Sequence, residues 1–138
     1  MIVLDTNVVS ELMSPKPSKV VTRWVSRHPA ATLFTTTITQ AEILYGVLLL
    51  PAGRRRKTIE ALAEAMFDQD FSGRVLGFDG NAARSYAEIA VERRRSGRPI
   101  SHFDAQIAAI ARAASAPIAT RNVADFDGCG VEVVDPWS

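Results

Sequence analysis

Short β-branched runs alternate with helical repeats from one end of this chain to the other, and this alternation constrains the fold more than any other feature. The apolar run at the start predicts a strand buried on both faces. Alternating strands and helices predict a parallel sheet with right-handed crossovers, hence a single α/β domain over residues 1–138. The predicted strands are 2–4, 32–36, 74–78, 118–120 and 132–134, and the predicted helices are 8–13, 18–27, 39–50, 57–67, 79–95 and 101–114. Four of these helices have an expected cap at their first residue, namely Ser18, Thr39, Asp79 and Ser101.

Composition narrows the classes of protein. With 47% hydrophobic and 22% charged residues, the chain has an ordinary globular balance. Its net charge of +1 is no strong attractor of polyanions, so any nucleic-acid affinity must come from local basic clusters. The lone Cys129 excludes an intramolecular disulfide and indicates a reducing compartment. Neither a targeting segment nor an apolar run of about 18 residues is visible, so we expect a soluble, cytoplasmic protein without a membrane span.

Acidic side chains fall where a parallel sheet would bring them together. Asp5 directly follows the first predicted strand, and Asn122 and Asp125 follow the fourth. Ligands of such sheets bind beyond the carboxyl ends of the strands. Two further acids, Glu42 and Asp104, are expected in the first turns of predicted helices, where apolar residues follow them.

Each of these acids alone has a structural explanation. The helix dipole favours a carboxylate in the first turn by about 0.3–1 kcal/mol, and Asp5 or Asn7 would serve as a helix cap. Together the acids require a further explanation, because several carboxylates at close range cannot all ionise without a counter-charge. Hard divalent cations such as Mg²⁺ or Mn²⁺ prefer oxygen ligands, and the single cysteine and two histidines lack the spacing of a softer site.

Four segments carry a resemblance to a known family, and they occur in that family's order across essentially the whole chain. They are 5–12 (DTNVVSEL), 38–46 (ITQAEILYG), 100–109 (ISHFDAQIAA) and 120–126 (TRNVADF). On these motifs the chain resembles PIN-domain nucleases, in particular the VapC and FitB-like toxins of bacterial toxin–antitoxin pairs.

The resemblance implies a PIN-like fold, with a central parallel sheet flanked by helices and the acids at one edge. It assigns Asp5, Glu42 and Asp104 to the family's acidic triad. Many PIN proteins have an acid where Asn122 stands, so Asp125 is expected to supply the fourth charge. These four acids are the expected metal ligands and catalytic residues, and the side chains expected to orient ligands or water are Thr6, Asn7, Thr120 and Asn122.

The implied activity is that of an endoribonuclease that uses Mg²⁺, with Mn²⁺ able to substitute, to activate water against an RNA phosphodiester bond. Asp5 and Asp104 are expected to bind the metal most directly, with Glu42 and Asp125 completing the site or holding a second ion. The implied partners are RNA, a cognate VapB- or FitA-like antitoxin, and a second copy of the chain in a homodimer that joins the antitoxin in a higher hetero-oligomer. DNA would be bound only through the antitoxin, and no membrane is expected.

Three basic clusters are candidates for RNA contact. Arg121 lies beside the fourth motif and is the best single candidate for a phosphate contact. A second cluster opens a helix, where positive charge opposes the dipole, and it would suit phosphates or an acidic partner; it consists of Arg54, Arg55, Arg56 and Lys57. The third, residues 93–98, lies at a helix C-terminus, where cations are favoured, and we interpret it as a solvated helix end.

Two other function classes stay open. Haloacid-dehalogenase-like phosphatases also place Asp after a first strand, but aspartyl-phosphate chemistry needs a second acid two residues on, where this chain has Asn7. A non-enzymatic regulatory or binding module would use its acids only as helix caps. The segment 43–50 is apolar nearly all round, which indicates a core helix with part of its surface free for a subunit contact.

Overall fold

A five-stranded parallel sheet forms the centre of the molecule in the computed structural model, which describes all 138 residues. The strand order is β3-β2-β1-β4-β5, and every neighbouring pair is parallel. All five predicted strands are present, which confirms the α/β class. Their bounds are β1 Ile2–Leu4, β2 Leu33–Thr36, β3 Val75–Leu76, β4 Ile118–Ala119 and β5 Val133–Val134.

Six α-helices connect the strands, and the sequence marks where three of them begin. The side chains of Ser18, Asp79 and Ser101 accept a hydrogen bond from a backbone amide in the first turn, as the sequence predicted for these caps. The helices are α1 Thr6–Leu12, α2 Lys19–Ser26, α3 Thr37–Leu48, α4 Arg54–Ala65, α5 Gly80–Arg95 and α6 His102–Ala113. Short helical turns add η1 Ala30–Thr32, η2 Met66–Asp70 and η3 Val123–Phe126.

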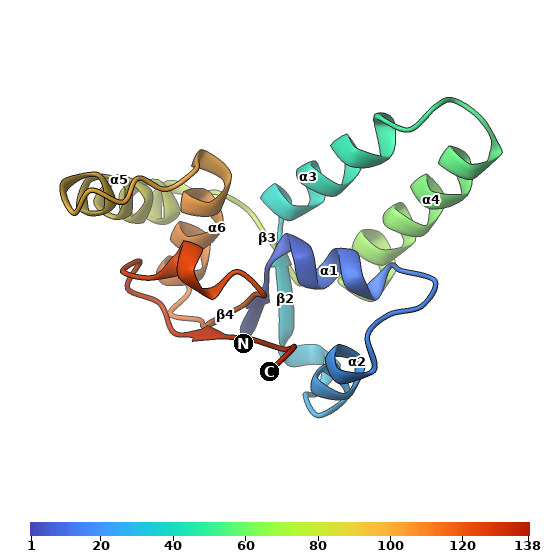
Figure 1. Cartoon of the computed structure of the whole chain (residues 1–138), viewed down its shortest axis with the longest axis horizontal. Helices are drawn as coiled ribbons and strands as arrows, with labels where there is room; N and C mark the ends of the chain where they lie inside the picture. Colours follow the sequence, from blue (N-terminus) through green and yellow to red (C-terminus); the bar gives the residue numbers. More distant parts are fainter.

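Helices cover both faces of the sheet, so the molecule has two hydrophobic cores (Figure 1). The helices α5 and α6 pack on one face, and α1 to α4 pack on the other. Because neighbouring residues of a strand point to opposite faces, Val3 belongs to the first core and Leu4 to the second. Ile118 and Ala119 divide in the same way. This double burial explains why β1 is a continuous apolar run.

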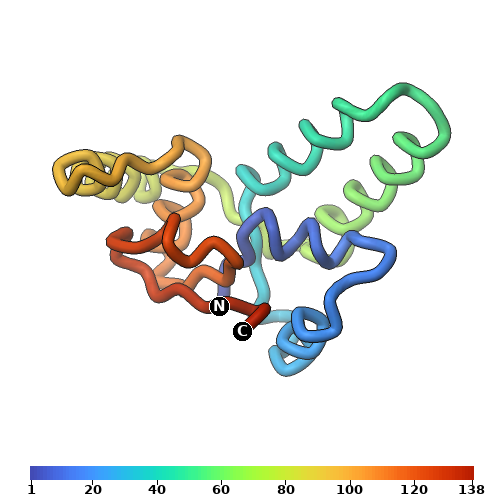
Figure 2. The backbone as a smooth tube through the Cα atoms, viewed as in Figure 1, coloured from blue at the N-terminus to red at the C-terminus, as the bar shows by residue number.

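The helices α3 and α4 pack side by side and extend away from the sheet (Figure 2). The turn between them contains Gly53, whose φ of 153° is a conformation that L side chains rarely adopt. On α3, Ile43 and Val47 are buried, whereas Tyr45 and Leu48, with Leu49 directly after the helix, are 68%, 53% and 66% exposed. The helix is therefore core on one side only, and its other side is an uncovered apolar surface.

The structure corrects the start of α3. The sequence placed Glu42 in a first turn that Thr39 would cap, but the helix begins at Thr37, so Glu42 lies in its second turn. The cap is Thr36, the last residue of β2, whose hydroxyl accepts the amide of Thr39 at 3.0 Å. Strand and helix are thus joined without a loop, and Thr39 is left fully buried beside the acids.

No helix in the structure is both long enough and apolar enough to span a lipid bilayer.

Candidate metal and active site

The carboxyl ends of β1 and β4 bring two motifs together that are far apart in the sequence. These strands are parallel neighbours, so Asp5 after β1 and Thr120 after β4 lie at the same edge of the sheet. Asp5 is only 4% exposed. Its Oδ1 accepts the amide of Thr6 at 2.8 Å, which caps α1, and its Oδ2 accepts the Thr120 hydroxyl at 2.8 Å.

Asn7 and Thr120 tie the first motif to the fourth. The Asn7 side-chain amide donates to the Thr120 oxygen at 3.2 Å and, more weakly, to Asp5 at 3.4 Å. Its carbonyl oxygen accepts the amide of Arg121 at 3.2 Å, and the Thr120 oxygen accepts the amide of Asn122 at 3.1 Å. Asn7 therefore joins two loops by donating and accepting at once, which a carboxylate at position 7 would not do.

Thr6 and Thr39 connect Asp5 to the acid on α3. The Thr6 hydroxyl donates to Glu42 Oε1 at 2.8 Å and lies 3.0 Å from the Thr39 hydroxyl. Glu42 is half-buried, so this bond fixes a carboxylate that faces the interior as well as solvent. The first two motifs thus meet through threonine hydroxyls rather than through basic side chains.

Burial and mutual repulsion raise the pKa values of these acids. Burial raises the pKa of Asp5 from 3.8 to about 6, although the bonds from Thr120 and Thr6 favour its ionised form, and the charges of Asp104 and Glu42 add to the rise. Burial likewise raises the pKa of Glu42, against the bond from Thr6, and the charge of Asp104 raises it further. Since the charge of Asp104 acts on both Asp5 and Glu42, the three carboxylates share one electrostatic environment.

Asp104 and Asp125 form the other part of this environment. Asp104 lies in the first turn of α6, and its amide donates to the Ser101 hydroxyl at 3.2 Å. Burial raises the pKa of Asp104, Ser101 opposes the rise, the charge of Asp125 adds to it and the charge of Arg93 lowers it again. Asp125 belongs to η3 and is exposed.

The oxygen atoms of these acids have the chemistry of a site for a hard cation, although the acids lie apart from one another. No three of the acidic side chains are close enough to share one ion in their present positions. Mg²⁺ usually keeps several waters and takes one or two carboxylates, so it does not require such a cluster. Oxygen donors alone suit Mg²⁺ or Mn²⁺ better than a softer metal. Burial, and to a lesser extent repulsion between the carboxylates, raises their pKa values, and a bound cation would favour their ionised forms.

Comparison with known proteins decides the family. The model of the PIN domain family matches residues 2–127, a range that contains all of the acids described above. The chain belongs to the PIN-domain family.

Individual relatives place the chain within that family. VapC ribonuclease Y4jK of Sinorhizobium fredii is 39% identical over 137 residues, which are 99% of this chain and 98% of that protein. Toxin FitB of Neisseria gonorrhoeae is 36% identical over 137 residues, or 99% of each chain. A solved structure of FitAB bound to an IR36 DNA fragment superposes with a TM-score of 0.92 at 36% identity, covering 100% of this chain and 96% of that one. This PIN domain is of the VapC and FitB type, as its four motifs predicted.

A groove of about 910 Å³ in this PIN domain is lined by one of the four acids, Glu42. Thr6 and Glu42 belong to its lining, as do Arg54 and Arg55 from the first turn of α4. Arg56 and Lys57, the other two members of that basic cluster, do not line it. Most of the remaining wall comes from α1, α3 and α4, and its apolar side chains are Met13, Ile43, Val47, Leu50, Ile59 and Leu62.

The main-chain amide of Arg121 bonds to Asn7 near the acids, but the Arg121 side chain points toward Trp137. Its guanidinium carbon is 5.2 Å from the ring centroid of Trp137, a cation–π contact near the C-terminus. A phosphate contact by Arg121 would therefore require the side chain to leave this ring, and that role stays a prediction.

Two residues near the acids were missed or misread from the sequence. Thr39 was taken for a helix cap, whereas it is buried and contacts Thr6. Arg93 was interpreted as part of a solvated helix end, which is wrong because it is only 6% exposed. The signal for Arg93 was its helical spacing, since it follows the buried Ile89 by one turn on α5.

Proposed function

We propose that this PIN domain, taken as one unit over residues 1–138, is a Mg²⁺-dependent endoribonuclease of a toxin–antitoxin pair. The observation that carries the proposal is the shared electrostatic environment of Asp5, Glu42 and Asp104, which come from separate motifs. Beyond the larger effect of burial, the charge of Asp104 raises the pKa values of both Asp5 and Glu42. The similarity to a protein named a VapC ribonuclease, at 39% identity over nearly the whole length, supports the same activity.

The metal ligands in this proposal are the four acids. Asp5 and Asp104 bind most directly, and Glu42 and Asp125 complete the site. When bound, Mg²⁺ lowers the pKa of a coordinated water and neutralises the charge that builds on the phosphate. Mn²⁺ is expected to substitute, because it prefers the same oxygen ligands.

The polar neighbours keep these acids in place and ionised. Thr6 and Thr120 donate to carboxylate oxygens, which leaves the remaining lone pairs of Glu42 and Asp5 free for a cation or water. The Asn7 side chain holds the loop after β4 beside Asp5 through its bonds to Thr120 and Arg121, and the main-chain amide of Asn122 donates to Thr120 within that loop. Such neighbours of metal ligands typically change affinity or activity about 10- to 100-fold when they are altered.

RNA would reach the acids past the basic residues nearest to them. Arg54 and Arg55 line the groove beside Glu42, and Arg121 would turn from Trp137 to contact a phosphate. If these cations, with Arg56 and Lys57, contact phosphates, the binding constant for RNA falls steeply as salt rises. A flat salt response would remove them from the RNA-binding surface.

The groove is the proposed seat of the antitoxin. Its apolar wall between α1, α3 and α4 suits an amphipathic segment of a VapB- or FitA-like protein, and its contact with Glu42 would place that segment over the acids. The solved FitAB structure, which holds a toxin of this type in a complex with DNA, supports a partner of that kind. DNA binding would then belong to the antitoxin, within a higher hetero-oligomer.

A homodimer is proposed from the uncovered side of α3. Tyr45, Leu48 and Leu49 form an exposed apolar surface on a helix that also carries Glu42. Contiguous apolar surface of this kind marks interaction sites. Light scattering on the isolated chain tests the dimer, and a monomer at high concentration would refute it.

Metal dependence separates the nuclease from its alternatives. Purified protein is expected to cleave RNA with Mg²⁺ or Mn²⁺ and to lose activity in EDTA, whereas full activity in chelator would end the proposal. Addition of Mg²⁺ is expected to raise the melting temperature, which a protein that uses its acids only as caps would not show. An aspartyl-phosphate enzyme would trap phosphate on Asp5, and we expect none because Asn7 is already committed to the loop contacts.

A further inference from the structure

Arg93 is the only buried cation in the molecule. It is 6% exposed and takes part in neither of the two ion pairs, Arg98–Asp127 and Arg112–Glu88. A buried charge without an ionic partner is costly unless hydrogen bonds replace the water it has lost. Its contacts therefore show which part of the structure it stabilises.

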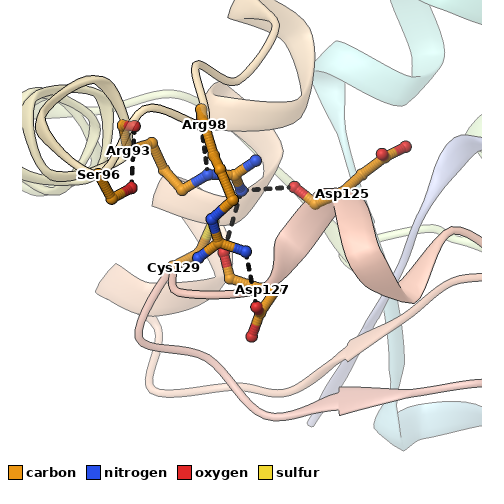
Figure 3. A network of polar contacts seen from close by, with 6 residues as sticks. All are labelled: Arg93, Ser96, Arg98, Asp125, Asp127 and Cys129. Carbon is orange, nitrogen blue, oxygen red and sulfur yellow. Dashed lines mark hydrogen bonds and ion pairs between the residues drawn. The ribbon is translucent and has the colours of Figure 1, made fainter.

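All of the hydrogen bonds of the Arg93 side chain reach main-chain carbonyls or a thiol, and most of them lie in one segment (Figure 3). Its Nη1 donates to the carbonyl oxygens of Asp125 at 2.8 Å and Asp127 at 3.0 Å, and lies 3.7 Å from the Sγ of Cys129. Its Nε donates to the carbonyl oxygen of Arg98 at 2.7 Å. The guanidinium thus joins the end of α5 to the segment that contains η3.

That segment carries the fourth acid. Arg93 holds the carbonyl of Asp125, while the Asp125 carboxylate points away from the guanidinium (Figure 3). The carboxylate is close enough to Asp104 to raise its pKa, and the charge of Arg93 acts on Asp104 in the opposite direction. The residue that fixes the main chain of one acid therefore also offsets the charge around another.

We propose that Arg93 is the positioning residue of the fourth acid, because it holds the main chain of η3 from which the Asp125 carboxylate projects. The inference rests on the proposed function, because it gives Asp125 a part in metal binding. Arg93 itself touches neither metal nor substrate.

Arginine suits this position better than lysine. Its planar fork donates along several fixed directions at once, whereas an ammonium is a single point that keeps fewer of these bonds. Arg93→Lys retains the charge but is expected to lose the bond from Nε to Arg98 or those from Nη1 to Asp125 and Asp127. The single substitution Arg93→Lys therefore separates the effect of the positive charge from the effect of the hydrogen bonds.

The test measures Mn²⁺ affinity by calorimetry in a double-mutant cycle of Arg93→Lys and Asp125→Ala. Each single variant is expected to weaken binding by about tenfold or more. The double variant is expected to bind no more weakly than Asp125→Ala alone, because Arg93 acts through Asp125. Unchanged affinity in Arg93→Lys, or losses that multiply in the double variant, would overturn the inference.

Arg98→Met is the matched control. The Arg98 side chain makes one ion pair with the same segment, to Asp127 at 2.8 Å, in which the two side chains are 51% and 68% exposed. Such exposed pairs contribute little, and the Arg98 carbonyl that Arg93 uses is retained. Mn²⁺ affinity should stay within about twofold of the unchanged protein. An Arg98→Met loss as large as that of Arg93→Lys would mean that any loosening of the segment has this effect.

Hydrogen exchange provides a test that needs no variant. The amides of Asp125, Asp127 and Cys129 bond within the segment, and they should exchange slowly if Arg93 holds it. Exchange at the rate of an unstructured peptide would overturn the inference even if Arg93→Lys does not fold. Failure of the unchanged protein to bind Mn²⁺ or to cleave RNA would instead reject the proposed function.

Discussion

The two halves of the candidate site hold their acids by different means. In the first half, Asp5 and Glu42 accept hydrogen bonds from neutral groups, the hydroxyls of Thr120 and Thr6 and one backbone amide. In the second half, which contains Asp104 and Asp125, the buried cation of Arg93 holds the main chain of one acid and acts on the charge of the other.

This difference between the two halves shows which carboxylates have no positive charge near them in the protein. Neutral donors fix the direction of a carboxylate but leave its charge in place, so burial still raises the pKa of Asp5 to about 6. Arg93 partly compensates Asp104 from within the protein. The first half is thus the part of the site that we expect to depend most on an external cation, and the following experiments test that contrast.

The largest effect is expected from Asp5→Asn, which keeps the shape of the first half and removes its charge. The variant should lose RNA cleavage by about a thousandfold or more in saturating Mg²⁺, because a principal ligand of the metal is gone. Single-turnover cleavage of a labelled RNA measures it. Asp68→Asn, a change at an exposed acid, is the control and should cleave normally. Cleavage by Asp5→Asn within a few-fold of the unchanged protein would take Asp5 out of the site.

The pH dependence of stability without metal is the next largest effect. A pKa of about 6 against an ordinary 3.8 means that folding favours the protonated form of Asp5. The contribution of Asp5 to the free energy of unfolding is full below pH 4 and is lost as the pH rises through 6. At 1.36 kcal/mol per pKa unit, this loss is about 3 kcal/mol. Urea unfolding in EDTA should show the free energy of unfolding falling over this interval.

Two comparisons sharpen that result. In Asp5→Asn the fall should be much smaller, so the variant should be more stable than the unchanged protein at pH 7 in EDTA. Added Mg²⁺ should recover stability at pH 7 and have little effect at pH 4.5, where protons compete for the ligands. If the free energy of unfolding depends on pH equally in the two proteins, the ionisation of Asp5 is not what destabilises the metal-free protein.

The sequence predicted the sheet and the order of its elements because these depend on local patterns. The run Ile2 to Leu4 is apolar since both its faces are buried, and Ser18, Asp79 and Ser101 mark helix starts by a short-range bond. The parallel arrangement then followed from alternation. The four motifs likewise identified the family and gathered the acids into one candidate site.

What the sequence could not predict depends on contacts between distant segments. Glu42 was placed one turn too early because Thr36 and Thr39 are equally good caps locally, and only the end of β2 decides between them. Arg93 stands in a basic run whose other members are exposed, and its burial depends on carbonyls more than thirty positions away, such as that of Asp125. Such pairings arise from tertiary structure and leave little trace in local composition.

A smaller effect is expected from Thr6→Val, which removes a hydroxyl from the first half at nearly constant volume. Glu42 would lose its 2.8 Å donor, so the pKa of Glu42 should rise further and cleavage should fall about tenfold. The acid limb of the pH–rate profile should also move to higher pH, a shift that a merely structural role would not produce. Thr22→Val, on α2 and away from the acids, is the matched control. An unmoved profile in Thr6→Val would show that Glu42 titrates independently of Thr6.

The smallest effect probes the second half through Ser101→Ala. The Ser101 hydroxyl caps α6 at the amide of Asp104, so its loss should cost about 1 kcal/mol of stability, as for other serine caps. Ser18→Ala removes the equivalent cap of α2, far from the acids, and should cost a similar amount. Only Ser101→Ala should also weaken Mn²⁺ binding, by about two- to threefold, since it loosens the first turn that carries Asp104.

If both variants weaken Mn²⁺ binding equally, the global stability of the protein sets the metal affinity, and the contrast between the two halves of the site fails. If neither does, Asp104 is held mainly by the packing of α6 against α5, and the second half is the more rigid of the two.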